Sequence, residues 1–322
     1  MTGFLIRRLL QALILLWVMS FVTYGLLALM PGDPIDLMLA GDPSVTSADV
    51  ARLRALHGLD RPFIERYGDW LAGALKGDLG YSRLFGAPVL DVLAPRLLNS
   101  LLLMGLAFLL AVSIALPASV AAARRPGSMV DRLINLLCFA GISVPAFWLA
   151  LLMILLFAVT LGLFPASGMV TIGDGGFRDR AAHLALPVVT LAVASIAQYT
   201  RHGRAAMIEV LREDYIRTAR AKGVTEQAIL WRHGFRNALI PVVTIMALDF
   251  GALFSGALIV ETMFAYLGMG KTIYDAVMGN DYNLALVGLL LATAVTLAAN
   301  IAADIAYGLI DPRIRLTGGR RA

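Results

Sequence analysis

Long uncharged stretches alternate with short charged segments along the whole of this chain. A bilayer core about 30 Å thick requires about 20 apolar residues of helix to cross it. Runs that approach or exceed this length occur at Leu9–Met30, Leu97–Ala123, Leu133–Phe164, Leu184–Thr200, Ala238–Val260 and Leu284–Ala303. The pattern therefore predicts an all-α membrane protein with six transmembrane helices.

The first run could be taken for a secretory signal, because Arg7 and Arg8 precede it. The apolar part of a signal peptide is only about 7–15 residues long and is followed by a small-residue cleavage site. Here 22 uncharged residues lead into the sequence MPGDP. We interpret this run as an uncleaved first transmembrane helix.

Basic residues are distributed unevenly between the two sides that six spans define. Of the 27 lysines and arginines, 17 lie on the side of the two termini. The positive-inside rule then predicts that both termini are cytoplasmic. The predicted organisation is an N-terminal tail with the first helix at 1–30, a periplasmic insert at 31–96, and a core of five further helices at 97–322.

The periplasmic insert carries helical patterns of its own. Thr46, with an acidic residue three positions later, predicts a helix start, and Gly58 predicts its end. A second helix is expected after Pro62, which suits a first turn. Its apolar face is formed by Phe63, Tyr67, Trp70, Leu71 and Leu75. We expect this face to cap the membrane helices or to lie at the interface, and a substrate site in the insert stays an alternative.

Two residues within the predicted spans suggest a solute pathway. Pro145 lies in the third run, where it removes a backbone hydrogen bond and kinks the helix; the kink could line a pathway or serve packing alone. Asp249 lies near the centre of the fifth run, where a charge costs about 2.5–3.5 kcal/mol unless it faces polar groups or water. Asp249 should therefore line a pathway and meet a substrate ammonium, or hydrogen-bond to a neighbouring helix. Asp304 is expected to pair with a basic residue near the cytoplasmic surface.

Composition then excludes several classes of function. The chain is 59% hydrophobic and 15% charged, which fits no soluble nucleic-acid-binding protein. Its single cysteine, Cys138, can form no intrachain disulfide. The four histidines, His57, His183, His202 and His233, show no metal-binding spacing, and no catalytic constellation is present, so we predict neither a metal site nor an enzyme.

The segment Ala265–Thr272, AYLGMGKT, comes within one residue of a phosphate-binding loop. It lacks the strand that precedes such a loop and falls on the predicted periplasmic side, so we expect no nucleotide there.

A charged insert, His202–Asn237, interrupts the apolar pattern between the fourth and fifth runs. The apolar face of its first helix is formed by Met207, Val210, Leu211, Tyr215 and Ala219. Gly223 marks the expected end of that helix, and Thr225 is the expected N-cap of a second. A helix-turn-helix that reads DNA must be free to enter a groove, whereas this segment is tethered to the membrane at both ends. We therefore predict a cytoplasmic helical hairpin and no nucleic-acid partner.

The stretch REDYIRTARAKGV, followed by RHGFRNALIP, resembles the cytoplasmic coupling loop of binding-protein-dependent ABC importer permeases of the dipeptide, oligopeptide and nickel branch. Arg217 and Thr218 replace the Glu and first Ala of the widest form of the motif, and 16 residues separate Gly223 from Ile240 and Pro241. Both departures resemble this branch. Further matches cover nearly the whole chain: IRRLL, PGDP, GDLGYS, GISVPAFWLA, PASG and DPRIR.

The resemblance implies a type I importer permease fold in the bacterial inner membrane and a set of partners. These are a second, homologous permease, two ATPase subunits that carry ATP and Mg²⁺, and a periplasmic binding protein that delivers the solute. Peptides are the expected solute, with nickel, glutathione or opine-like molecules as alternatives. An ion-coupled secondary transporter or a channel is the alternative class of function. The resemblance further implies that the ATPase docks on Glu213, Asp214, Tyr215, Arg217, Thr218, Ala219, Arg220, Lys222 and Gly223.

Overall fold

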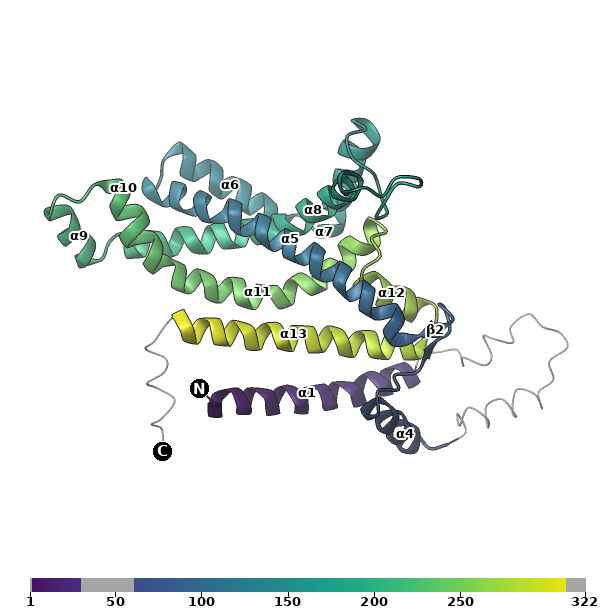
Figure 1. Ribbon diagram of the computed structural model, residues 1–322. Helices are drawn as coiled ribbons and strands as arrows, with labels where there is room; N and C mark the ends of the chain where they lie inside the picture. The colour runs from purple at the N-terminus through teal and green to yellow at the C-terminus, as the bar shows by residue number, and fades with distance from the viewer. Residues whose placement is uncertain (1, 30–60, 311–322) are drawn as a thin grey trace. The chain divides into compact units, whose positions relative to one another are not determined.

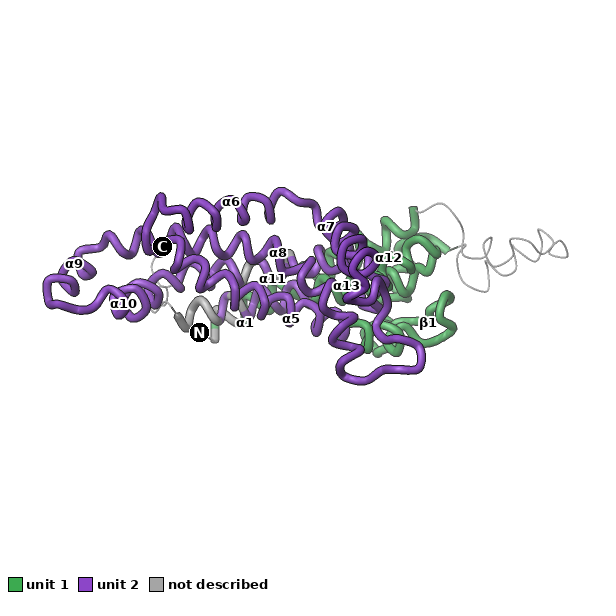
Figure 2. Tube along the Cα trace, turned by 90° about the horizontal axis from the view of Figure 1, so that it is seen from above, with its two compact units in different colours: residues 1–98, 271–294 green, residues 99–270, 295–322 purple. Residues whose placement is uncertain are grey.

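The computed structural model describes residues 2–29 and 61–310, and these are mostly helical (Figure 1). The predicted helix between Thr46 and Gly58 lies outside the described residues. The chain divides into two compact units, coloured separately in Figure 2. Unit 1 comprises Met1–Leu98 and Lys271–Ala294, and unit 2 comprises Asn99–Gly270 and Val295–Ala322.

In unit 1 an amphipathic helix packs on the first long helix. Helix α4 (Phe63–Leu75) begins after Pro62 and lies against α1 (Thr2–Ala28). The ring of Tyr67 is buried, its hydroxyl lies 2.8 Å from Ser20 Oγ, and the rings of Phe63 and Phe21 meet edge to face at 5.5 Å. The predicted helix is confirmed and its aromatic residues pack on α1, although Leu75 at its end is exposed; a capping role for the membrane helices as a whole stays a prediction.

A small hairpin precedes the next long helix, and the sequence patterns do not anticipate it. Strands β1 (Tyr81–Ser82) and β2 (Ala87–Pro88) pair antiparallel. The buried carboxylate of Asp281 accepts hydrogen bonds from Ser82 Oγ at 2.6 Å and from the backbone N–H of Leu84 at 3.0 Å. Asp281 lies between α12 (Met269–Met278) and α13 (Tyr282–Ile310), so it ties the hairpin to the start of α13.

The core of unit 2 is built from long helices that approach closely through small residues. These are α6 (Met129–Ser143), α8 (Phe177–Val210), α11 (Arg236–Met263) and the part of α5 (Val89–Arg124) that follows Leu98. Helix α8 packs against both α6 and α11 (Figure 1). On α6, Gly141 lies so close to α8 that an added Cβ would meet Ala197 at 3.2 Å. Small residues at interfaces are typical of membrane helices, because packing and not the hydrophobic effect drives their association.

The third predicted run is broken more sharply than a kink. Helix α6 ends at Ser143, Val144 is extended, and α7 (Ala146–Met153) starts after Pro145 and continues as a π-helix, η1 (Ile154–Thr160). The two pieces are bent by 104°. Proline disfavours helical geometry in the residue before it, which explains the extended Val144.

The number of spans differs from the prediction. Four helices of the described residues are long and apolar enough to cross a membrane: Ile6–Ala28 within α1, α5, α8, and Tyr282–Ala302 within α13. The bent pair at Pro145 makes up to five. The fifth predicted run, Ala238–Val260, lies within α11, which is not among these spans, so the predicted six are not confirmed. The orientation of the termini stays a prediction.

Candidate functional site

The charged insert forms a helical hairpin at one end of unit 2. After α8 ends at Val210, the chain forms α9 (Asp214–Ala221), turns, and continues through α10 (Glu226–Ala228) and a π-helix, η2 (Ile229–Phe235), into α11. Figures 1 and 2 both show α9 and α10 projecting beyond the ends of α6 and α8. Thr225 accepts a hydrogen bond from the Ala228 N–H, as predicted for an N-cap.

The hairpin has its own small core, which consists of Ile216, Ala219 and Ile229 with Leu211 and Val224 packed against them. Ala219 is 9% exposed and faces this core, so its small side chain permits close approach within the hairpin itself. The break between α8 and α9 shifts the helical phase, and Ile216 takes the buried position that the sequence pattern gave to Tyr215. The prediction was wrong for Tyr215, which is 43% exposed.

The turn after α9 depends on a glycine. Gly223 has φ +78°, the left-handed region that L-residues rarely adopt. Its N–H donates to Arg220 O at 3.0 Å, and the next N–H, of Val224, donates to Ala219 O at 3.2 Å. This pair of bonds is a Schellman motif, and Val224 makes the apolar contact that accompanies it. The predicted helix end is confirmed.

The remaining residues of the predicted docking loop are exposed, and several pair with one another. Arg217 donates to Asp214 at 3.0 Å, and Arg220 donates to Glu226 at 2.7 Å across the turn. The hydrogen bonds from Arg220 lower the pKa of the Glu226 carboxyl. Glu213 precedes α9, Thr218 Oγ1 donates to Asp214 O, and the Tyr215 hydroxyl accepts from Asn237. These residues form a solvent-exposed surface of the hairpin. All of the following are exposed: Glu213, Asp214, Tyr215, Arg217, Thr218, Arg220, Lys222 and Gly223.

A buried ion pair anchors α8 near the hairpin, and sequence reasoning missed it. Asp131, 3% exposed, accepts two hydrogen bonds from the guanidinium of Arg204, one of them from Nη2 at 2.8 Å. Its other acceptor sites receive the Gly127 N–H at 2.8 Å and Asn135 Nδ2 at 2.7 Å. The sequence does carry a local signal for the start of α6, because Ser128 is its N-cap. No sequence spacing, however, identifies Arg204, 73 residues away, as the partner of Asp131.

Asp249 lies at the contact between α8 and α11. Its Oδ2 accepts hydrogen bonds from Ser195 Oγ at 2.8 Å and from the Tyr199 hydroxyl at 2.7 Å. The predicted alternative of a hydrogen bond to a neighbouring helix is therefore confirmed. Asp249 also lines a cavity of about 200 Å³, together with Val144 and Ala146 on either side of the helix break. Pro145 itself is not among the lining residues.

The segment that resembles a phosphate-binding loop packs on a buried acid. An added Cβ at Gly268 would lie 2.2 Å from Glu261 Cδ, and one at Gly270 would lie 2.6 Å from Leu258 Cα. Ser100 donates to the Glu261 carboxylate, which is fully buried. The glycines thus allow the loop to close over this carboxylate, a contact that repels a phosphate.

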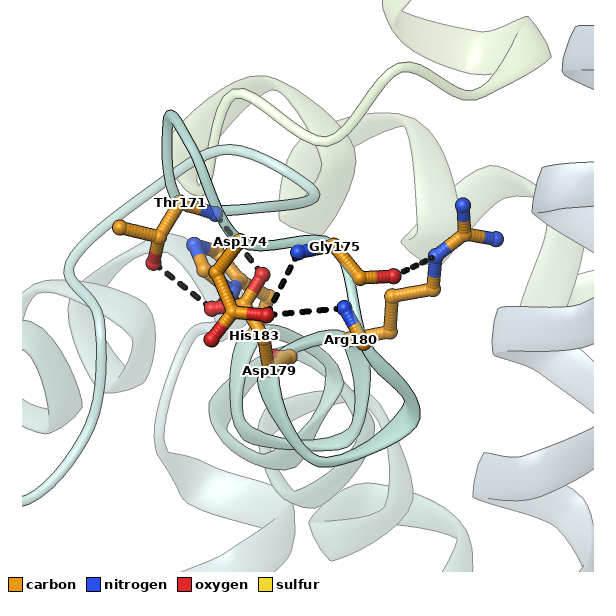
Figure 3. Close-up of polar contacts among 7 residues, drawn as sticks. Thr171, Asp174, Gly175, Asp179, Arg180 and His183 are labelled. Atoms are coloured by element: carbon orange, nitrogen blue, oxygen red, sulfur yellow. Dashed lines mark hydrogen bonds and ion pairs between the residues drawn. The ribbon is translucent and has the colours of Figure 1, made fainter.

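A second polar cluster lies where the loop after η1 enters α8 (Figure 3). Asp179 accepts hydrogen bonds from the Thr171 N–H and hydroxyl at 2.8 and 2.7 Å, and its Oδ1 lies 3.4 Å from His183 Nδ1. Asp174 accepts the N–H of Gly175 at 2.7 Å and that of the next residue. These bonds fix the start of α8. Within the described residues no group of three or more His, Cys, Asp or Glu side chains could hold a metal ion.

Comparisons with known proteins place these features in a family. Residues 115–316 match the family described as "Binding-protein-dependent transport system inner membrane component", and residues 1–95 match the N-terminal family of such membrane components. The chain is 38% identical over 316 residues to the oligopeptide transport system permease protein AppB of Bacillus subtilis, covering 98% of this chain and 99% of that relative. It is 34% identical over 337 residues to the dipeptide transport system permease protein DppB of Escherichia coli K12, covering 98% of this chain and 99% of DppB.

Among solved structures, an inward-facing form of the MetNI methionine ABC transporter matches with a TM-score of 0.58 and 19% identity. The match covers 70% of this chain and 98% of that chain. At this identity the likeness shows the fold alone.

Proposed function

This chain belongs to the family of binding-protein-dependent transport system inner membrane components, and we propose that it is the permease subunit of an ATP-driven importer of di- and oligopeptides. The family and the apolar helices make it a multi-pass inner membrane protein. The proposed cargo is inferred from the relatives. The chain matches an oligopeptide permease and a dipeptide permease over nearly their full length.

The observation that carries the mechanism is the continuity of the hairpin with the helices of the core. From Glu226 through η2 to Met263 the chain is continuously helical, because the residues at both junctions have right-handed helical backbone. A force applied at the hairpin therefore reaches Asp249 through unbroken helix.

We infer that the exposed surface of the hairpin docks on an ATPase subunit, which holds ATP and Mg²⁺. A second, homologous permease would dock on a second ATPase subunit, and a periplasmic binding protein would supply the peptide. Closure of the two ATPases on ATP would draw the two hairpins together and switch the helices between inward-open and outward-open arrangements, as a rigid-body transition. The small buried core of the hairpin supports this role, because a lever must transmit force without unfolding.

Reconstitution tests the proposal. The tagged chain, coexpressed with the products of its neighbouring genes, is purified and placed in liposomes with ATP inside and the binding protein with labelled trialanine outside. We expect stoichiometric recovery of a second permease and ATPase subunits, and peptide accumulation that requires both ATP and the binding protein. Accumulation driven by an ion gradient in the absence of ATP would instead identify a secondary transporter, and purification of the chain alone would refute the importer.

A further inference from the structure

The cavity beside Asp249 is enclosed by three helical pieces of unit 2. Helix α6 and the start of α7 contribute one wall, α8 the second and α11 the third. Its volume of about 200 Å³ is below the range of about 300–1,000 Å³ typical of sites for drug-sized ligands. It therefore fits one end group of a larger solute and not a whole peptide.

Two polar groups of this cavity have unused hydrogen-bonding capacity. The hydroxyl of Thr190, a lining residue 3% exposed, has no hydrogen-bond partner among the described residues. A buried polar group without a partner is costly, so a site that retains one usually has a use for it. Both hydrogen bonds to Asp249 end on Oδ2, and within the described part of the chain Oδ1 accepts none.

The charge of the cavity selects the class of ligand. Asp249 is its one charged lining residue, and no basic side chain of the described residues forms an ion pair with it. The other lining side chains are neutral and mostly apolar, among them Leu191 and Leu253. An ammonium group carries three donors and no acceptor, which matches a carboxylate and a hydroxyl on two residues that line the same cavity. An anion would be repelled.

We propose that Asp249 and Thr190 form a site for the terminal ammonium group of the transported solute. This inference rests on the proposed function for the identity of the solute, and it adds the end of the peptide that is recognised and the residues that recognise it. Ser195 and Tyr199 are positioning residues, because they hold the carboxylate through Oδ2 and leave Oδ1 without a hydrogen bond among the described residues.

Substitution by asparagine separates recognition from structure. The side-chain oxygen of Asp249→Asn can still accept from Ser195 and Tyr199, so the contact between α8 and α11 is kept while the charge is lost. Asp249→Ala loses both. Asp174→Asn removes an equal charge from an exposed loop of the same unit and is the matched control.

The first measurement is import of two probes by the reconstituted complex: trialanine, and the analogue of equal size in which a hydroxyl replaces the terminal ammonium. Each variant is compared with the wild type for each probe, so that the preference of the binding protein cancels. Asp249→Asn should reduce trialanine import about tenfold or more, as for a lost charged hydrogen bond, and change import of the analogue less than about twofold. Thr190→Val should act in the same direction, and Asp174→Asn should change neither rate.

Equal import of trialanine by the wild type and Asp249→Asn would overturn the inference and leave Asp249 a structural residue. Loss of the partner permease from the Asp249→Asn complex would also overturn it, in favour of a partner side chain that fills the cavity. A wild-type complex that imports neither probe would refute the peptide cargo instead.

A second measurement tests whether the cavity admits cations, and it requires no transported solute. In purified complex carrying Thr190→Cys and Cys138→Ala, a cationic methanethiosulfonate should modify the new thiol about tenfold faster than an anionic one of similar size, after correction for their rates with free thiol. Adding Asp249→Asn should abolish this preference. An unreactive thiol, or one without charge preference, would show that the cavity does not admit cations.

Discussion

Gly223 allows a test of what holds the helical hairpin of residues 214–235 in shape. Its φ of +78° is strained for any L-residue with a Cβ, and the space around a Cβ built there is empty within 4 Å. Replacement by alanine therefore adds backbone strain and no collision. That strain is about 1–2 kcal/mol, which corresponds to a factor of about 5–30 in the opening equilibrium of the turn.

Asparagine separates backbone strain from side-chain size. It is larger than alanine but tolerates the left-handed conformation better. Strain alone predicts that Gly223→Asn is milder than Gly223→Ala, whereas a loop that needs a small residue for contact with an ATPase predicts the reverse order. Hydrogen exchange of the Gly223-position and Val224 amides reports the opening of the turn, and recovery of ATPase subunits with the tagged chain reports docking.

We expect faster exchange of both amides in Gly223→Ala, a smaller change in Gly223→Asn, and ATPase recovery in the same order. Gly127→Ala is the matched control, because Gly127 has φ +81° and an equally open surrounding but lies between α5 and α6. It should leave exchange in the hairpin unchanged. Normal exchange in both Gly223 variants, with ATPase recovery lost most in Gly223→Asn, would refute the strain argument.

Three further outcomes follow from buried or paired acids. Arg204→Ala leaves the Asp131 carboxylate buried and unpaired, so it should destabilise the protein by about 3–5 kcal/mol and lower the thermal midpoint of the purified complex; an unchanged midpoint would contradict the pair's importance. Gly268→Ala places a Cβ against the Glu261 carboxylate and should cost about 1–3 kcal/mol in the same assay, with no effect on nucleotide binding by the complex. The pKa of Glu226 is lowered in the folded hairpin, so its stabilising effect is present above the ordinary glutamate pKa and is lost as pH falls through the folded value. Hydrogen exchange of the turn should therefore accelerate on acidification, and Glu226→Gln should remove that pH dependence.

Local patterns predicted the elements better than their partners. The hairpin could be predicted because Gly223 and Thr225 are end signals that act through adjacent backbone groups. The position of Tyr215 could not, because the three residues between α8 and α9 shift the helical phase and no periodicity crosses such a break. The bend at Pro145 was foreseen as a kink, but its 104° angle depends on how both halves pack.

The polar contacts of unit 2 show the same limit. Asp249 stood out because a charge in an apolar run demands a reason, yet Ser195 and Tyr199 gave no such signal, since single hydroxyls are ordinary in membrane helices. The ion pair between Asp131 and Arg204 could not be predicted from the sequence for a similar reason. Charged residues near the ends of spans are expected, so neither drew attention alone.

The two helices that continue into the hairpin are also the two that the Asp249 hydrogen bonds join. Helix α8 carries Ser195 and Tyr199, and α11 carries the carboxylate. A slide of α11 along α8 by the rise of a single residue, about 1.5 Å, is more than half of a 2.7 or 2.8 Å hydrogen bond and would break or redirect both. Such a slide, if movement of the hairpin produced it, would change the aim of the carboxylate. A permease built in this way would present Oδ1 to the cavity in one arrangement of the helices and withdraw it in the other, which is what release of a bound ammonium requires.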